Sequence, residues 1–125
     1  MRSERLDEAM KAFARVERGI VEFGMAGDTQ HAVELIRLRK QMITEFAALS
    51  AALEADPFLA ERREAKTDLL RLFSAFRTAN ALNTAEWPAI RVRDDVPSFR
   101  AAATSVGHAS RAFWRRIEQE LPLAA

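Results

Sequence analysis

The chain has 125 residues, 19 of them Lys or Arg and 18 Asp or Glu, which leaves a formal net charge of +1. Charges of both signs alternate along the chain, which argues against a nucleic-acid surface, because such a surface needs clustered basic residues. The chain contains no cysteine, which excludes disulfides, thiolate metal sites and cysteine nucleophiles. Its length is typical of one domain (residues 1–125) with a core of its own.

The first residues, MRSERLDEAMKAF, carry three acids and no apolar stretch, so we expect no signal peptide. No window approaches the roughly 20 apolar residues that a transmembrane helix requires. We therefore expect a cytoplasmic protein that does not bind membranes.

The first predicted helix covers residues 3–24, and the second covers residues 29–55. In the first, apolar residues recur at steps of three and four, and Ser3 is a predicted N-cap. The sequence GMAGD predicts a tight turn between the two helices. On the inner face of the second helix we expect Ala32, Leu35, Ile36, Met42, Ile43, Phe46, Leu49 and Leu53.

The third predicted helix begins at Asp56, where the following Pro57 has a backbone angle suited to a first helical turn. Its apolar residues continue to Ala79. The helix is expected to fade in NALNTAEW, because Asn and Thr are poor helix formers.

The stretch EWPAIRVRDDVPS is predicted to be irregular, because Pro88 disfavours helical angles at the residue before it. A fourth helix is predicted to start near Pro97 and to end at about Leu121. The expected fold is all-α: an antiparallel bundle of four helices with one irregular crossing loop at about residues 84–96.

Two charged residues fall inside apolar helix faces. On a helical projection, Arg39 lies in the arc of Leu35 and Met42, and Glu17 lies in the apolar arc of the first helix. Both are equally distant from the predicted turn, so we predict a structural ion pair between Glu17 and Arg39 that fixes the register of the two helices. In that arrangement, Arg39→Leu alone costs about 3–5 kcal/mol, and replacing both residues is nearly neutral.

Known catalytic and metal-binding patterns are not found in the sequence. His31, Glu34 and His108 do not form the paired Glu-x-x-His motifs of di-iron bundles. There is no Ser/His/Asp pattern and no glycine-rich phosphate loop. We therefore predict no catalytic, cofactor-binding or metal site.

Four large apolar residues lie in or near the crossing loop or on the last helix: Trp87, Ile90, Val92 and Trp114. Tryptophan is favoured in the cores of protein interfaces, so these four are candidate contacts to a partner. The alternative left open is that the loop folds over the end of the bundle and closes it.

The segment AGDTQHAVELIRLRKQMITEFAAL resembles the second helix of flagellar type III export chaperones of the FliT and FlgN kind. The likeness covers residues 24–50 and is carried by Gly27, Asp28, Leu35 and Arg39. It implies a small, all-helical cytoplasmic protein that holds an export substrate in an apolar groove. The stretch EWPAIRVRDDVP has no counterpart in that family.

A second segment, DPFLAERREAKTDLL, is similar to the Asp-x-x-Arg-Glu helix of helical chorismate mutases, which work with arginines. Here Ala60 stands three residues before Arg63, where that motif has its acid. Our first expectation is a non-enzymatic module that binds another protein. The alternatives are a homodimer built from its own copy and, third, a small arginine-dependent enzyme.

Overall fold

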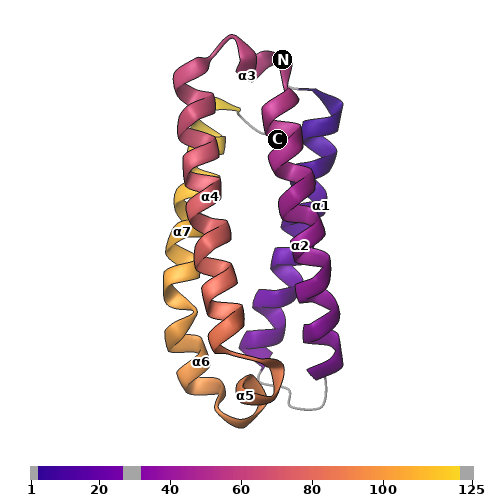
Figure 1. Cartoon of the computed structure of the whole chain (residues 1–125), viewed down its shortest axis with the longest axis vertical. Coiled ribbons are helices and arrows are strands. Elements are labelled where there is room, and N and C mark those ends of the chain that lie inside the picture. The colour runs from indigo at the N-terminus through magenta and orange to yellow at the C-terminus, as the bar shows by residue number, and fades with distance from the viewer. Residues whose placement is uncertain (1–2, 27–31, 122–125) are drawn as a thin grey trace.

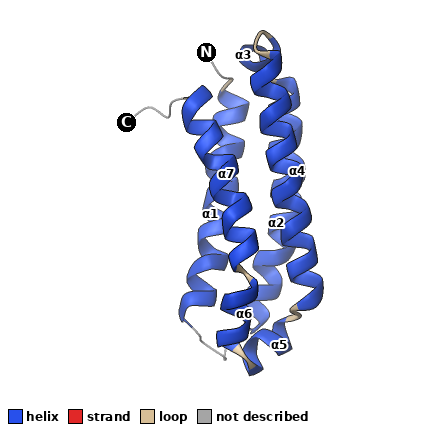
Figure 2. Cartoon of the chain, turned by 90° about the vertical axis from the view of Figure 1, so that its left-hand side faces the viewer, coloured by secondary structure: helices blue, strands red, loops and turns tan. Residues whose placement is uncertain are grey.

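The computed structural model describes residues 3–26 and 32–121, and this part of the chain is all-α. Four long helices lie lengthwise, a short helix closes one end, and two short helices lie at the other end (Figures 1 and 2). No helix in these residues is long and apolar enough to cross a membrane. The helices are α1 (Glu4–Ala26), α2 (Ala32–Ala55), α3 (Pro57–Ala60), α4 (Arg63–Glu86), α5 (Ala89–Asp94), α6 (Val96–Ala102) and α7 (Thr104–Glu120).

The all-α class is confirmed, but the prediction of an irregular crossing at 84–96 is wrong. Residues up to Glu86 continue α4, and the chain then forms α5 and α6. Trp87 leaves the helical region with φ −124° and ψ 71°, as a residue before proline is expected to do. Pro88 then takes the N-cap position of α5, where a missing N–H costs little. The predicted fourth helix is likewise divided, into α6 and α7, at Ala103.

Ser3 and Asp56 stand at the starts of α1 and α3. The third predicted helix is divided, because α3 ends at Ala60 and α4 begins at Arg63. The Ser3 hydroxyl accepts a hydrogen bond from the first turn of α1. The fully buried Asp56 carboxylate accepts one from the backbone N–H of Leu59 at 3.1 Å and another from that of Ser3 at 2.6 Å. Asp56 therefore caps α3 and also ties it to the beginning of α1. The predicted GMAGD turn covers residues 24–28; α1 continues past the predicted helix end to Ala26, and the rest of the turn lies outside the described residues.

The core is built around phenylalanines from all four long helices. The Phe13 ring of α1 lies 4.9 Å from that of Phe46 in α2 and 5.4 Å from that of Phe73 in α4. Phe73 lies 4.7 Å from Phe113 of α7. Helix α1 packs mainly along α2, and α4 packs mainly along α7. These rings therefore join two pairs of helices across the middle of the molecule.

Helix α2 is rotated from its predicted orientation. Leu38, which was not predicted to face inward, is buried, whereas Ile36 and Ile43 are 46% and 65% exposed. Leu38 packs closely against α1, since a Cβ atom on Gly19 would lie 3.3 Å from Cδ2 of Leu38. The buried face therefore centres on Met42, and one flank of the predicted apolar face is left outside.

Helices α5 and α6 close one end of the long helices (Figure 1). A second apolar cluster forms there, and it is separate from the phenylalanine core. It consists of Leu35, Trp87, Ala89, Val92 and Phe99.

Candidate functional site

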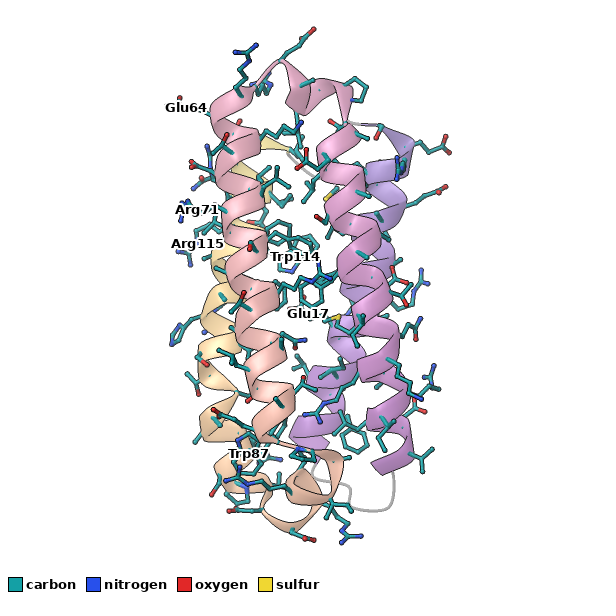
Figure 3. All side chains as sticks on the ribbon, viewed as in Figure 1. Glu17, Glu64, Arg71, Trp87, Trp114 and Arg115 are labelled. Atoms are coloured by element: carbon teal, nitrogen blue, oxygen red, sulfur yellow. The ribbon has the colours of Figure 1, made fainter. Side chains whose placement is uncertain are left out.

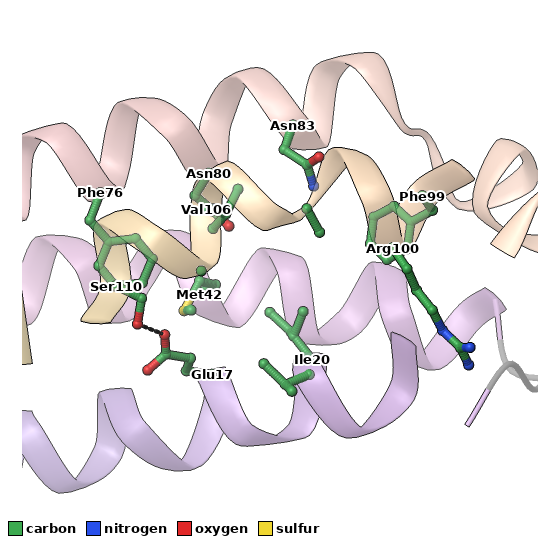
Figure 4. Close-up of a pocket in the computed structure, with 13 residues that line it drawn as sticks. Glu17, Ile20, Met42, Phe76, Asn80, Asn83, Phe99, Arg100, Val106 and Ser110 are labelled. Atoms are coloured by element: carbon green, nitrogen blue, oxygen red, sulfur yellow. Dashed lines mark hydrogen bonds between the residues drawn. The ribbon is translucent and has the colours of Figure 1, made fainter. Parts of the chain in front are cut away.

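A pocket of about 290 Å³ lies between α1, α4 and the α6–α7 segment, with Met42 of α2 in its wall (Figure 4). Val21, which is 56% exposed, lies at its edge. Its apolar lining residues are Ile20, Val21, Met42, Phe76, Phe99, Ala103, Val106 and Gly107, and its polar ones are Glu17, Asn80, Asn83, Arg100 and Ser110.

Glu17 forms the polar end of the pocket. One of its carboxylate oxygens accepts a hydrogen bond from the Ser110 hydroxyl, and the other accepts one from Nε1 of Trp114 at 2.9 Å. Figure 3 shows Trp114 and Glu17 near each other in the middle of the molecule. Both donors are neutral, so they orient the carboxylate without neutralising it. Within the described residues, Glu17 makes no ion pair.

Asn80 and Asn83 of α4 supply the amide groups of the pocket. Their side chains make no hydrogen bond to any other described residue. Each amide can donate and accept hydrogen bonds. The sequence predicted only that these residues weaken the helix, yet they lie within α4 and face the pocket.

The predicted ion pair between Glu17 and Arg39 is wrong. Nη1 of Arg39 donates instead to the backbone carbonyl oxygen of Trp87 at 2.6 Å. Trp87 is the C-cap of α4, and carbonyl groups at a helix C-terminus lack partners within the helix and attract cations. Glu17 turns toward α7 while Arg39 turns toward the end of α4, so neighbouring helices supply a different partner for each.

Burial lowers the pKa of the Arg39 guanidinium from its ordinary value. The group stays charged at neutral pH, because a guanidinium is too basic to lose its proton in a protein. Arg91 assists at the same helix end: it donates to the carbonyl oxygen of Glu86 at 2.6 Å, and its guanidinium lies 3.9 Å from the ring centre of Trp87. Arg39 therefore has a structural role outside the pocket.

The four candidate partner contacts have different environments. Trp87 and Val92 are only 4% and 3% exposed, inside the cluster that closes the end of the molecule. Trp114 is partly buried against the main core. Ile90 is 64% exposed, so among these four it is the side chain most accessible to another molecule. Trp87 and Val92 therefore pack within the chain at one end of the long helices, and contact of this segment with a partner stays a prediction.

Arg39 lies apart from Arg62 and Arg63. Arg62 and Arg63 lie at the α3–α4 junction, in a shallow depression that Arg116 also lines. Arg39 contacts the other end of α4. The part of the chain that the structure describes contains no cluster of three potential metal ligands. His108 lies beside Arg111 instead, and His31 is outside the described residues.

No protein family, curated protein or solved structure matches this chain in the comparisons. The resemblance of residues 24–50 to export chaperones therefore stays a prediction. The pocket between the two helix pairs combines an apolar lining with several polar side chains.

Ser110 is a site residue that the sequence analysis missed. It is buried with 9% of its surface exposed, and seven residues separate it from Ile117, which places both on one helix face. Glu17 and Arg39 were identified because each is a polar residue on an apolar helix face. The same criterion, used on the last predicted helix, would have identified Ser110 as a buried polar group that needs a hydrogen-bond partner.

Proposed function

We propose that this chain is a non-catalytic binding module that receives a largely apolar segment of a partner protein in the pocket between α1 and α6–α7. In this proposal the four long helices act as one antiparallel bundle in the cytoplasm. The pocket itself carries the proposal, because its mainly apolar lining would gain contacts from an inserted apolar group. A concave apolar site with a few polar groups is the usual form of a binding site.

The chemistry of the lining supports binding over catalysis. The Ser110 hydroxyl donates to a carboxylate that also holds the Trp114 indole, so the carboxylate is already engaged by neutral donors. The other polar side chains on α4 are amides, which suit recognition. The volume is near the lower end of the roughly 300–1,000 Å³ of small-molecule sites, which suits one inserted side chain with its neighbours.

A narrower form of the proposal is a flagellar export chaperone. Its support is the resemblance of residues 24–50, together with a pocket that could serve as the apolar groove expected for such proteins. The occupant would then be a helix of the export substrate, docked by its apolar side chains.

Site-specific photo-crosslinking in cells that express the gene tests the proposal. A photoreactive amino acid replaces Val21 at the edge of the pocket or, as the matched control, Leu82 on α4, which is exposed to a similar degree (56% and 61%) but does not line the pocket. We expect position 21 to capture one defined partner, with the crosslink mapping to an apolar segment, and position 82 not to capture it. Equal capture at both positions, or none at position 21, would contradict the proposal.

A homodimer is the second candidate function, and the outer face of α2 favours it. Val33, Ile36 and Ile43 are 79%, 46% and 65% exposed, although α2 also buries an apolar face in the core. Ala47 and Ala51 are exposed on the same side of the helix, and small residues allow two helices to approach closely. This side of α2 could therefore pack against a second copy of itself.

The charges on this side of α2 fit a two-fold axis. Lys40 and Glu54 are exposed and lie seven residues to either side of Ala47, so in an antiparallel pair centred there Lys40 of one copy faces Glu54 of the other. Sedimentation equilibrium over a dilution series tests this arrangement. We expect a dimer that Ile43→Asp converts to a monomer; a wild-type monomer at every concentration would exclude it.

A further inference from the structure

We infer that the group inserted into this pocket is positively charged: a lysine-like cation on an apolar chain, which pairs with Glu17. This inference rests on the proposed function and adds the chemistry of the partner. It concerns the polar end of the pocket, where one carboxylate lies beside apolar walls.

The charge of Glu17 is the first observation. Its two hydrogen-bond donors, Ser110 and Trp114, are neutral, and no described cation pairs with it. Glu17 is partly buried, and a carboxylate in such a place is stabilised by a charged partner. A carboxylate has about four acceptor positions, so two donors leave room for an ammonium group.

The shape of the lining is the second observation. Apolar side chains from α1, α2, α4, α6 and α7 surround the path to Glu17. Such walls suit the methylene chain of a lysine, whose charged end extends beyond its apolar stem. The free amides of Asn80 and Asn83 lie along the α4 side and can bond to the backbone of the inserted segment.

Among the described residues that line the pocket, Arg100 is the only other charged one, and Figure 4 places it at the end opposite Glu17. A cation that reaches Glu17 is therefore separated from Arg100 by the length of the pocket. An acidic group in the same position would instead meet the Glu17 carboxylate. The polarity of the pocket thus favours a cation at its Glu17 end.

Three small probes of equal chain length test the charge of the occupant: n-hexylamine, which is a cation at neutral pH, neutral 1-hexanol and anionic hexanoate. Trp114 provides the readout, since its indole N–H binds Glu17 and gives one resolved proton–nitrogen NMR signal. Trp87 gives the other indole signal and serves as an internal reference, because it does not line the pocket. We expect hexylammonium to move the Trp114 signal saturably, with an affinity about tenfold above that of hexanol.

Glu17→Gln removes the charge while retaining an oxygen that can accept a hydrogen bond. We expect this variant to bind hexanol as the wild type does and to lose the preference for hexylammonium. Glu8→Gln is the matched control, because Glu8 is exposed on the same helix and does not line the pocket. It changes the net charge equally and should keep the preference.

The outcomes separate the inference from the proposed function. Equal binding of hexanol and hexylammonium by the wild type would overturn the charge claim and leave an apolar pocket. A preference that survives Glu17→Gln would overturn the role of Glu17. A Trp114 signal that no probe moves, or that hexanoate moves most, would also overturn the inference, while crosslinking at position 21 tests the proposed function independently. The comparison of probes on the wild type does not depend on the folding of any variant.

Discussion

Arg39 holds the C-terminal end of α4 from a neighbouring helix. Its guanidinium meets a backbone carbonyl that has no partner within the helix, at the end where the helix dipole is negative. The guanidinium is partly withdrawn from water, which is why its pKa is lowered. The arginine in the apolar face of α2 is therefore a cap for another helix, a role that needs a long side chain with a permanent charge.

Replacement of Arg39 should weaken this helix end. We expect Arg39→Leu to lower the free energy of unfolding by about 1.5–3 kcal/mol, the range for a hydrogen bond to a charged group. Arg39→Lys keeps a charge and a donor, so its loss should be smaller. Urea unfolding measures both, and a loss below about 0.5 kcal/mol for Arg39→Leu, the level of an ordinary surface substitution, would mean that the cap contributes little.

Glu17 and Arg39 should act independently of each other. Since each has its own partners, a double-mutant cycle of Glu17→Gln and Arg39→Leu should be additive within about 0.5 kcal/mol. The same urea experiments provide all four free energies. A coupling above about 1 kcal/mol, as residues in direct contact show, would restore the ion pair that the sequence predicts.

Asp95 should make stability depend on pH in the acid range. It caps α6, and hydrogen bonds from the side chain and then the backbone N–H of Ser98 lower the pKa of its carboxyl. A group whose pKa is lower in the folded state stabilises the fold fully above its ordinary pKa of about 4, and this contribution is lost as the pH falls through the folded value.

Asp95→Asn is the matched variant for this effect, because asparagine also caps helices but does not titrate. Unfolding should be followed for both proteins from about pH 6 to about pH 2.5. We expect the advantage of the wild type over Asp95→Asn to shrink as the pH falls. A difference that stays constant would show that the Asp95 carboxyl does not contribute through its charge.

At the scale of helices, the long elements could be predicted because each carries an apolar face of several turns. Helix α5 could not be predicted in this way, because a helix of six residues is too short to be stable alone. It exists because Ala89 and Val92 are buried against Trp87 and Leu35. Pro88 correctly predicts that Trp87 leaves the helical region, but the predicted fading of the helix at Asn80 and Asn83 is wrong, and Pro88 also caps the next helix.

Asp56 should be the most sensitive helix cap in the chain. It is fully buried and accepts hydrogen bonds from the backbone of both Leu59 and Ser3. Asp56→Ala leaves both N–H groups without this partner, so we expect a loss of about 2–3 kcal/mol of unfolding free energy. Asp94→Ala is the control, because that side chain is largely exposed in its pair with Arg93 and should change stability by less than about 0.5 kcal/mol. Similar losses in the two variants would contradict the proposed role of Asp56.

At the scale of the whole molecule, two helix pairs meet through phenylalanine rings. The pocket lies next to these rings, between Phe76 of α4 and Phe99 of α6. Helical periodicity predicts that Phe13 and Phe73 point inward, which they do. It cannot predict the distance between the pairs, because that depends on how the rings interdigitate. Of the polar residues of the site, the sequence singled out only Glu17, as a charge in an apolar face. Its partners could not be predicted, because they depend on the distance between the helix pairs.

Burial within the chain limits which of the candidate surfaces can contact a partner. Trp87 and Val92, the residues first favoured as contacts, are occupied in closing one end of the molecule. The candidate surfaces that remain are the exposed Ile90, the pocket beside Glu17 and the outer side of α2. A partner that enters the pocket must pass its rim, where Val21 is exposed.

Photo-crosslinking from position 21 in an Ala103→Phe background tests the central claim most directly. Ala103 lines the pocket and joins α6 to α7 with right-handed helical angles that a larger residue can adopt. A phenylalanine there would fill the space that the partner is proposed to occupy. We predict that the partner crosslinked from position 21 is lost in this background while the circular dichroism and unfolding midpoint stay near those of the wild type. Undiminished crosslinking with the pocket filled would contradict the account.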